Sequence, residues 1–462
     1  MPNQCFPVKP DIINDRIDAH FYNPEFFQLL KEMKQITQKN NTLELLKLDK
    51  LLIDSENDLG ITGGATPLGA TYLEEGITFI RVQNVRRNKI NLKKVKYIPE
   101  LIHNNMLKRS QLKPDDVLLT ITGMTYGLSA VVPPSLKEAN MNQHSVRMRI
   151  KKDIILPSFL SFFLNSKFGR IQTDRYVTGS TRPALDYVSI RNISILKPNN
   201  TNDQKKIMDK VDNFIVKSNQ NTKDYELLVI KIPEIILNNL KIEMPQEKQN
   251  IYATKQIEDR FDAKYYSPFL NKLKQNIMRF PHEKLGKITE IDSIKKIYIS
   301  DSYRLVELDD IDEELGLVKR VKSVLELASQ RTVLKKDRVI ISKLQPDKGK
   351  AFIVDEELEG CIGSGELVSL KVISDMITKQ YLWCILRSPY ILKQWEYQIT
   401  GSTRERIGKD ELLNTIIPLP DDKTQEKIVL ETEKIIKEAL NLKRLHSDNI
   451  RRANEIFVKM LT

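Results

Sequence analysis

The tetrapeptide Gly179-Ser180-Thr181-Arg182 recurs later in the chain as Gly401-Ser402-Thr403-Arg404, at an offset of 222 residues. Residues 113–119 have a counterpart in residues 335–341 at the same offset. Residues 15–24 also resemble residues 259–268, where six of ten positions are identical at an offset of 244. Because these landmarks keep their order, the sequence predicts two homologous halves, roughly 1–245 and 246–462, with about 22 residues lost from the second.

The composition indicates a multidomain protein with real hydrophobic cores. The chain has 462 residues, of which 40% are hydrophobic, and this excludes wholesale disorder. No apolar run approaches the ~20 residues of a membrane-spanning helix, and the start shows no secretory signal. Cys5, Cys361 and Cys384 lie too far apart for a disulfide framework or a Cys-x-x-Cys zinc site. We therefore expect a cytoplasmic protein with no membrane association.

The charge balance is basic. There are 73 Lys and Arg residues against 61 Asp and Glu, which gives a net charge of +12. Such a surplus attracts polyanions, of which nucleic acid is the commonest. Six basic residues fall between Arg86 and Lys96, although a Lys-rich composition alone produces similar runs on solvated faces. Both interpretations stay open on charge alone.

Each half reads as a mixed domain followed by a helix. Residues 76–85 alternate like a strand, with Phe79, Arg81 and Gln83 on one face, and residues 117–121 and 145–150 also read as strands. Strands and short helices intermix without a regular βαβ rhythm, so the predicted fold class is α+β. The predicted boundaries are a first mixed domain at 1–200, a helix at 201–245, a second mixed domain at 246–420 and a second helix at 421–462.

The two helices carry apolar residues at steps of three and four. From residue 425 this pattern runs for 37 residues, which at ~1.5 Å each gives a rod of about 55 Å. A period of 3.5 residues sustained this long indicates a coiled-coil seam. The two helices can bury their seams against each other, although each could instead pack separately on its own domain. The pairing should bring Ile207, Val211 and Phe214 near Ala453, Ile456 and Met460. Pro233 should kink or end the first helix.

Catalytic motifs are missing from the sequence. It has no Gly-x-x-x-x-Gly-Lys-Ser/Thr phosphate loop, and its five histidines are scattered without metal-ligand spacing. The one Pro-Pro pair, Pro133-Pro134, lacks the flanking residues of a methyltransferase motif. We expect no active site, cofactor or metal in this chain.

Several motifs resemble the DNA specificity (S) subunit of type I restriction–modification systems. Gly63-Gly64-Ala65-Thr66-Pro67 is similar to the Gly-Gly-Thr-Pro turn that opens a target recognition domain, with Ala65 inserted. Residues 76–85 and 115–127 resemble the strand and the Gly-rich loop that follow, and residues 179–186 resemble the most recognisable family motif. The second half departs, because Glu405-Arg406-Ile407 follows its tetrapeptide and the Gly-Gly-Thr-Pro turn is absent.

The resemblance implies a plan for the whole chain. Two target recognition domains would each read one half of a bipartite sequence in double-stranded DNA, and the helices would form an antiparallel coiled coil with pseudo-two-fold symmetry. Two modification (methyltransferase) subunits would dock on this subunit, and restriction motor-nuclease subunits could join. S-adenosylmethionine would bind in the partner methyltransferase subunit, so this chain would be non-catalytic.

Residues suited to DNA contact gather on predicted strand ends and loops. Arg and Lys pair with guanine, Asn and Gln pair with adenine, and hydroxyls or loop N–H groups hold phosphates. Arg182 and Arg404 have two readings, DNA contact or a lock between domain and helix, and the second is favoured because their motif leads into the helix. The full set of candidates is Arg81, Gln83, Asn84, Arg86, Arg87, Thr122, Thr125, Tyr126, Asn142, Gln143, Arg182, Lys343, Gln345, Lys348 and Arg404.

Two other classes of function remain as alternatives. A fused type II-like restriction or modification enzyme would need a catalytic domain, for which two target recognition domains and two long helices leave no room. A stand-alone DNA- or RNA-binding regulator on the same fold is the other alternative, although the sequence lacks the signature of an RNA-recognition sheet.

Overall fold

The computed structural model of the chain describes residues 19–53, 59–67, 69, 72–179, 182–246, 264–292, 302–325, 331–401 and 404–462. Residues 15–18 and 259–263 of the first repeat, together with Ser180, Thr181, Ser402 and Thr403 of the tetrapeptides, lie outside these residues. The contacts divide the chain into two compact units. Unit 1 comprises Met1–Ser218 with Ser447–Thr462, and unit 2 comprises Asn219–His446. Each unit is described by itself.

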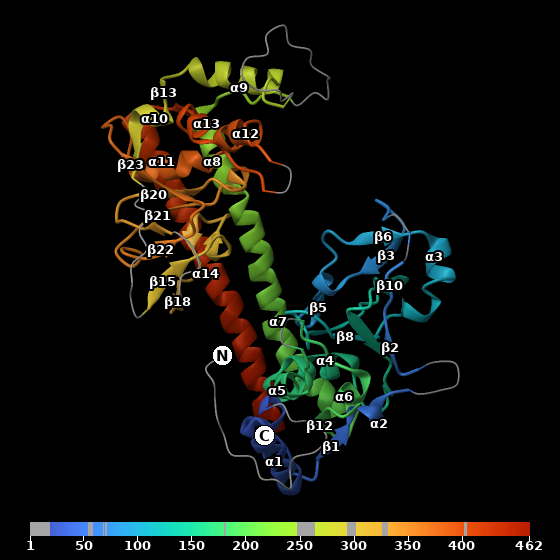
Figure 1. The fold of residues 1–462 in the computed structure, drawn as a ribbon. Helices are drawn as coiled ribbons and strands as arrows, with labels where there is room; N and C mark the ends of the chain where they lie inside the picture. The colour runs from blue at the N-terminus through green and yellow to red at the C-terminus, as the bar shows by residue number, and fades with distance from the viewer. Residues whose placement is uncertain are drawn as a thin grey trace. The chain divides into compact units, whose positions relative to one another are not determined.

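The globular part of unit 1 mixes short strands and helices (Figure 1). Its main helices flank a set of short strands, and short 3₁₀ turns lie between several of these elements. The elements are η2 (Ala19–Tyr22), α1 (Pro24–Lys39), β1 (Leu43–Lys47), α2 (Leu48–Leu51), β2 (Ile61–Gly63), β3 (Ile77–Ile80), η3 (Val82–Asn84), β4 (Val85–Arg86), β5 (Lys89–Ile90), β6 (Lys96–Ile98), α3 (Glu100–Asn104), η4 (Lys108–Ser110), β7 (Gln111–Leu112), β8 (Val117–Thr120), β9 (Ser129–Val131), β10 (Ala139–Met141), β11 (Ser145–Met148), α4 (Pro157–Asn165), α5 (Lys167–Tyr176), α6 (Tyr187–Arg191) and β12 (Ser194–Pro198).

The globular part of unit 2 repeats this series. The elements are α9 (Pro268–Met278), β13 (His282–Lys284), α10 (Leu285–Ile288), β14 (Thr289–Ile291), β15 (Tyr303–Val306), η5 (Leu308–Asp310), β16 (Ile311–Asp312), β17 (Leu317–Val318), β18 (Lys322–Val324), β19 (Thr332–Val333), β20 (Val339–Ser342), η6 (Pro346–Lys348), β21 (Ala351–Ile353), β22 (Ile362–Gly363), β23 (Leu367–Val372), α11 (Lys379–Leu386), α12 (Pro389–Glu396), α13 (Lys409–Leu413) and β24 (Ile416–Pro418). Three long or paired helices complete the chain: α7 (Thr201–Val229), α8 (Lys231–Leu240) and α14 (Asp422–Leu461).

Sheet topology confirms the duplication and the α+β class. Unit 1 contains two four-stranded sheets with strand orders β6-β3-β10-β7 and β2-β11-β8-β9. Unit 2 contains sheets of order β18-β15-β22-β19 and β14-β23-β20-β21, so every strand has a counterpart in the same position. In both units the sole parallel pair among the described strands of these sheets is the one at the centre, β3 with β10 and β15 with β22. Part of the deletion in the second half is a shorter first helix, since α1 has 16 residues and α9 has 11.

A buried glutamine attaches each long helix to its globular part. In unit 1 the side chain of Gln204 accepts from Leu156 N at 2.9 Å and donates to Ile154 O at 2.9 Å. In unit 2 the side chain of Gln425 donates to Met376 O at 2.9 Å and to Pro420 O at 3.0 Å. Buried amides are stable only when such bonds are made, so the two glutamines fix where each helix leaves its domain.

The helices pack antiparallel in each unit. In unit 1, Ile207 and Val211 of α7 share a hydrophobic core with Ala453 and Phe457 of α14. In unit 2, residues further along α7 and α8 meet the earlier part of α14. Thr222 Oγ1 lies 3.1 Å from His446 Nδ1, and Asn239 Nδ2 donates to Glu431 Oε2 at 3.1 Å.

Two details of the helix prediction are resolved by the structure. Helix α7 ends at Val229 and α8 begins at Lys231, because Pro233 has no N–H to donate to the carbonyl of Val229. Met460 and Phe214 pack against the core that holds Ile207, Val211 and Ala453, as predicted. Ile456 is half-buried and does not belong to this core, whereas Phe457 and Leu461 are fully buried in it. The residues at four-residue intervals from Ala453 face the domain core, as expected for a helix of 3.6 residues per turn that packs on a globular surface.

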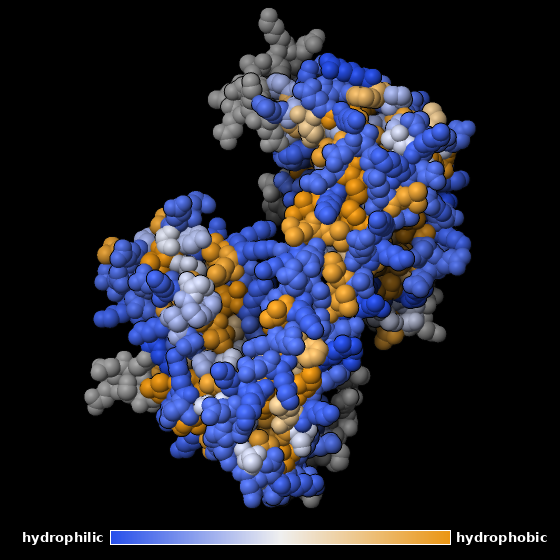
Figure 2. Space-filling view, turned by 180° about the vertical axis from the view of Figure 1, so that it is seen from behind, coloured by the Kyte–Doolittle hydropathy of each residue, from blue (hydrophilic) through white to orange (hydrophobic). Residues whose placement is uncertain are grey.

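Within the described ranges, no helix combines the length and the apolar stretch required to cross a bilayer. The visible face in Figure 2 is mostly hydrophilic and carries separate apolar patches. The predicted domain boundaries and the pseudo-two-fold axis stay predictions.

The Phe457 contact gives a test of the core shared by helix and domain. Its ring lies 5.2 Å from that of Phe159 and 4.8 Å from that of Phe162, centroid to centroid. Phe457→Ala should destabilise unit 1 by about 3–5 kcal/mol, the usual cost of such a truncation. Hydrogen exchange of α4 measures it, with Ile456→Ala as the control. Equal effects of the two variants would contradict the assigned packing.

Candidate nucleic-acid interface

The parallel pair in unit 1 places two candidate segments at one sheet edge. Strand β3 ends at Ile80 and β10 ends at Met141, and these two residues are paired in register. The backbone N–H of Asn142 donates to Ile80 O at 3.0 Å. Arg81 and Asn142 therefore leave the sheet side by side, as expected for the carboxyl ends of neighbouring parallel strands.

The strand predicted over residues 76–85 was wrong beyond Ile80. A 3₁₀ turn follows, in which Asn84 Oδ1 accepts from Arg81 N at 3.0 Å and Asn84 Nδ2 donates to Asn91 O at 3.0 Å. Asn84 is only 3% exposed, so its amide holds the turn and is not free to contact a base. Arg81 is half-buried and donates to Lys94 O at 3.3 Å, whereas Gln83 is exposed.

The residues that flank Ser180 and Thr181 pack on the loop after β8. Thr178 and Ala184 exchange two backbone hydrogen bonds of 2.9 and 2.8 Å, and Gly179 takes a φ of +87°, which favours glycine. Gly123 N donates to Pro183 O at 3.0 Å. The exposed side chain of Arg182 is thereby brought beside the loop that carries Thr122 and Thr125, both half-buried.

His144 lies at the centre of these loops, and the sequence analysis had not selected it. Its Nδ1 is 2.6 Å from Thr122 Oγ1. Burial, together with the positive charge of Arg182, holds the pKa of His144 below its usual range. The neighbouring Gln143 is exposed and bonds through its side chain to Thr66.

The Gly63-Gly64 turn is fitted to this arrangement. A Cβ on Gly64 would lie 2.1 Å from Asn142 O, so only glycine allows the close approach. The turn thus joins the three other loops to make one surface. We call this surface the first loop cluster, residues 64–67, 122–125, 142–144 and 182–184.

Three other candidates lie outside the first loop cluster. Tyr126 packs under Arg170, whose guanidinium is 5.2 Å from the ring centroid, and burial and the Asp174 carboxylate raise the pKa of Tyr126. This side chain supports α5 and is not free for DNA. Arg86 and Arg87 are exposed on the β4–β5 hairpin, which packs on α4 through a bond of 2.7 Å from Asn165 Nδ2 to Asn88 Oδ1.

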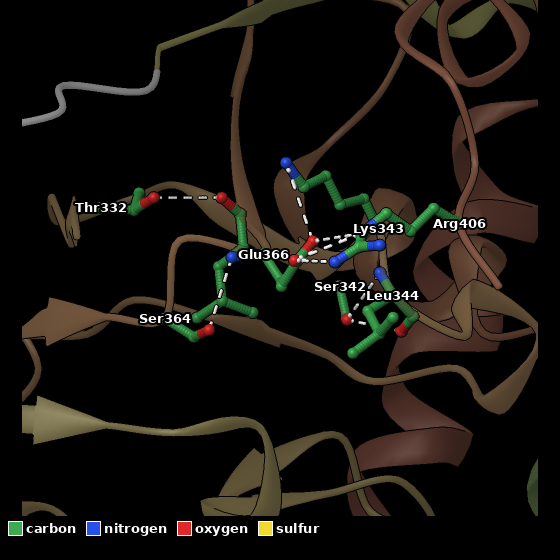
Figure 3. A network of polar contacts seen from close by, with 8 residues as sticks. Thr332, Ser342, Lys343, Leu344, Ser364, Glu366 and Arg406 are labelled. Atoms are coloured by element: carbon green, nitrogen blue, oxygen red, sulfur yellow. Dashed lines mark hydrogen bonds and ion pairs between the residues drawn. The ribbon is translucent and has the colours of Figure 1, made fainter. Parts of the chain in front are cut away.

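In unit 2 the corresponding loops are joined by ion pairs (Figure 3). Arg406 Nη2 lies 2.6 Å from Glu366 Oε1, and Lys343 Nζ lies 3.7 Å from Glu366 Oε2. Glu366 occupies the position of His144, because the N–H of Lys343 donates to Glu366 O as that of Ile121 donates to His144 O. The hydrogen bond from Arg406 holds the pKa of Glu366 below its usual range.

The remaining candidates of unit 2 are more accessible. Gln345 is exposed with a φ of +47°, and its N–H donates to Glu405 O at 2.8 Å. Lys348 is exposed and pairs with Asp347 at 3.1 Å, while Arg404 is exposed at the tip of its loop. We call residues 343–348, 364–366 and 404–406 the second loop cluster. Compared with the first, it carries more acidic residues.

Part of the second half is similar to a known family. Residues 287–447 match the family described as the type I restriction modification DNA specificity domain. The matched residues contain the whole second loop cluster, and their strand order is the one that unit 1 repeats.

Three individual proteins are similar to this chain, and the share of each that is covered differs widely. A segment of 96 residues is 33% identical to the specificity subunit of the type I restriction enzyme EcoAI of Escherichia coli, and it covers 20% of this chain and 16% of that relative. The S subunit of a type I restriction-modification system from M. genitalium is 12% identical, with 91% of this chain and 97% of that chain covered and a TM-score of 0.46. A chain from a structure on complex assembly and conformational transition of the type I R-M system is 17% identical, with 91% and 98% covered and a TM-score of 0.46.

The residues missed by sequence reasoning had weak signals. His144 directly follows the selected pair Asn142-Gln143, and only the sheet register shows that it contacts Thr122. Arg406 was noted as a departure from the family motif, whereas Glu366, its partner, gave no signal. Among the described residues, no group of three or more His, Cys, Asp or Glu side chains is placed to hold a metal ion.

The electrostatic effect of Arg182 on His144 can be measured directly. NMR titration of the histidines should find one pKa below the ordinary value of about 6.5, and Arg182→Ala should raise it because the repelling charge is gone. Arg182→Lys should keep it low, and Arg404→Ala should leave it unchanged. If the pKa of His144 does not respond to Arg182→Ala, the side chain of Arg182 does not lie near His144.

Proposed function

We propose that this chain is the DNA specificity subunit of a type I restriction–modification complex, with one DNA-reading domain in each half. The observation that carries the proposal is the duplication. The specificity-domain match covers residues 287–447, and the same strand order and the same tetrapeptide loop recur in unit 1. A second copy of a DNA-reading domain is expected to read a second stretch of DNA.

The two loop clusters differ in charge, which supports the proposal that they recognise different half-sites. Arg182, Gln143 and Thr122 present donors and acceptors suited to base edges and phosphates in the first loop cluster. In the second, Arg406 and Lys343 are paired with Glu366, which leaves Gln345, Lys348 and Arg404 as the accessible polar groups. Different donor and acceptor patterns select different bases.

The long helices are the proposed docking surface for two methyltransferase subunits, and restriction subunits could join them. Each helix exposes large apolar side chains that its own unit does not bury, among them Val216 and Leu227 on α7 and Leu430 on α14, which are 66%, 65% and 58% exposed. Apolar side chains that lie together on a surface favour protein contacts, so we propose these positions as the first to test for docking. S-adenosylmethionine would then bind in the partner subunit.

Assembly and reading can be tested together by isolating the chain from its native host with any methyltransferase subunit that it binds, and by reconstituting the complex. The complex should methylate a bipartite sequence, and the lone chain should show no activity with S-adenosylmethionine or Mg²⁺. Activity of the lone chain would favour the fused enzyme. DNA binding by a chain that assembles with no methyltransferase subunit would favour a stand-alone regulator.

Mapping of methylated sites tests the assignment of the readers. The double variant Gln143→Ala with Arg182→Ala should relax one half-site, because each lost base contact removes about 1–3 kcal/mol of discrimination. The matched variant Arg404→Ala should relax the other half-site and leave the first unchanged. Unaltered specificity in both variants would exclude the loop clusters as the reading surface.

A further inference from the structure

Met124 is the most exposed large apolar side chain among the described residues. Its exposed fraction is 91%, whereas that of Leu325, the next in order, is 75%. Single apolar side chains on a protein surface are common, so exposure alone indicates nothing. Met124 differs from the others in its place, because it lies within the first loop cluster between Thr122 and Thr125, which are both half-buried.

The backbone that carries Met124 is held by the domain on both sides. The Gly123 N–H donates to Pro183 O at 3.0 Å, and the Tyr126 N–H donates to Gly123 O at 3.1 Å, which closes the turn around Met124. Arg170 Nη1 donates to Tyr126 O at 2.5 Å on the far side of the turn. A turn fixed in this way presents the methionine without having to be ordered by a ligand, which lowers the entropy cost of binding.

The duplicated unit shows that this turn does not need an exposed apolar side chain. Residues 345–348 of unit 2 match residues 123–126, and each turn is closed by a bond of 3.1 Å from its last N–H to its first carbonyl. The first N–H of each turn also donates to the carbonyl of the residue that follows the repeated tetrapeptide. Met124 therefore corresponds to Pro346, which is buried. The exposed methionine is a property of the first loop cluster and not of the fold.

The chemistry of the major groove indicates what an apolar side chain can read there. Arg182 and Gln143 can contact base edges through hydrogen bonds, whereas the 5-methyl group of thymine is apolar and is recognised by apolar contact. Such a contact is favourable because it removes both apolar surfaces from water. Methionine suits it, since its unbranched, polarizable side chain adapts to the shape of its partner.

We infer that Met124 is a specificity-determining residue that contacts the 5-methyl group of a thymine in the half-site read by unit 1. The inference rests on the function proposed above and adds a base to it. The polar groups of the first loop cluster select bases by hydrogen bonds, and Met124 adds selection for a methyl group beside them.

The test compares duplexes that carry thymine or deoxyuridine at the same position. Deoxyuridine pairs with adenine as thymine does and lacks only the 5-methyl group. The half-site of unit 1 is the one that the double variant Gln143→Ala with Arg182→Ala relaxes in methylation mapping. Each thymine of this half-site is replaced in turn, and the affinity of the assembled complex for each duplex is measured by fluorescence anisotropy.

At one thymine the wild-type complex should bind the deoxyuridine duplex about four-fold more weakly, which is the effect of one methyl-sized group. Met124→Ala should bind the two duplexes of that pair equally, and Met124→Leu should retain the difference because leucine is also apolar. The matched control is Met106→Ala, which truncates a 53% exposed methionine of unit 1 outside the first loop cluster and should keep the wild-type difference.

Three results would contradict the inference. The half-site of unit 1 could contain no thymine, or Met124→Ala could discriminate between the duplexes as the wild type does. In the third, Met124→Ala weakens binding although deoxyuridine has no effect on the wild type, as expected for a side chain wedged between base steps. A wild-type complex that recognises no bipartite sequence would overturn the proposed function, and the inference with it, before any Met124 variant is compared.

Discussion

Burial of the helix seam inside the domain cores is the constraint on which each unit depends. Phe457 of α14 and Val211 of α7 are packed in the same core as the aromatic face of α4. In unit 2, Ile232 of α8 and Ile428 of α14 share the core with α11 and α12. A globular domain that shares its core with two helices cannot turn freely on them, because any rotation would expose apolar surface. The orientation of each loop cluster relative to its helix segments is thus fixed by packing.

Sequence patterns predicted what depends on local order. The repeated landmarks, the apolar steps along residues 425–461 and the helix break at Pro233 follow from residues close together in the chain, and the structure confirms them. The paired glutamines Gln204 and Gln425 could be recognised as landmarks, but their bonds to distant carbonyls could not. The predicted strand over 76–85 was too long. The side chain of Asn84 accepts a hydrogen bond from a backbone N–H and closes a turn there, but the sequence pattern of alternating residues does not reveal this turn.

The candidate site was predictable only in part for a related reason. Thr122, Gln143 and Arg182 come from three loops far apart in sequence, and their proximity depends on the parallel pairing of β3 with β10 and on the bonds that dock the tetrapeptide loop. Side chains of similar chemistry, such as Asn84 and Tyr126, prove to be structural because hydrogen bonds within the domain occupy them. Residue type alone does not distinguish a group that faces solvent from one that closes a turn.

The composition of unit 1 has a consequence for the order in which the protein folds during synthesis. Ala453, Phe457 and Leu461 belong to the core of unit 1, yet the ribosome makes them after every residue of unit 2. Until then Phe159 and Phe162 lack the ring of Phe457, so part of the first domain's core stays open while the second domain is made. A chain that stops short of residue 447 would have an apolar gap in its first domain and not in its last. Chaperones and proteases would therefore distinguish complete from incomplete chains at the N-terminal domain, which is made first.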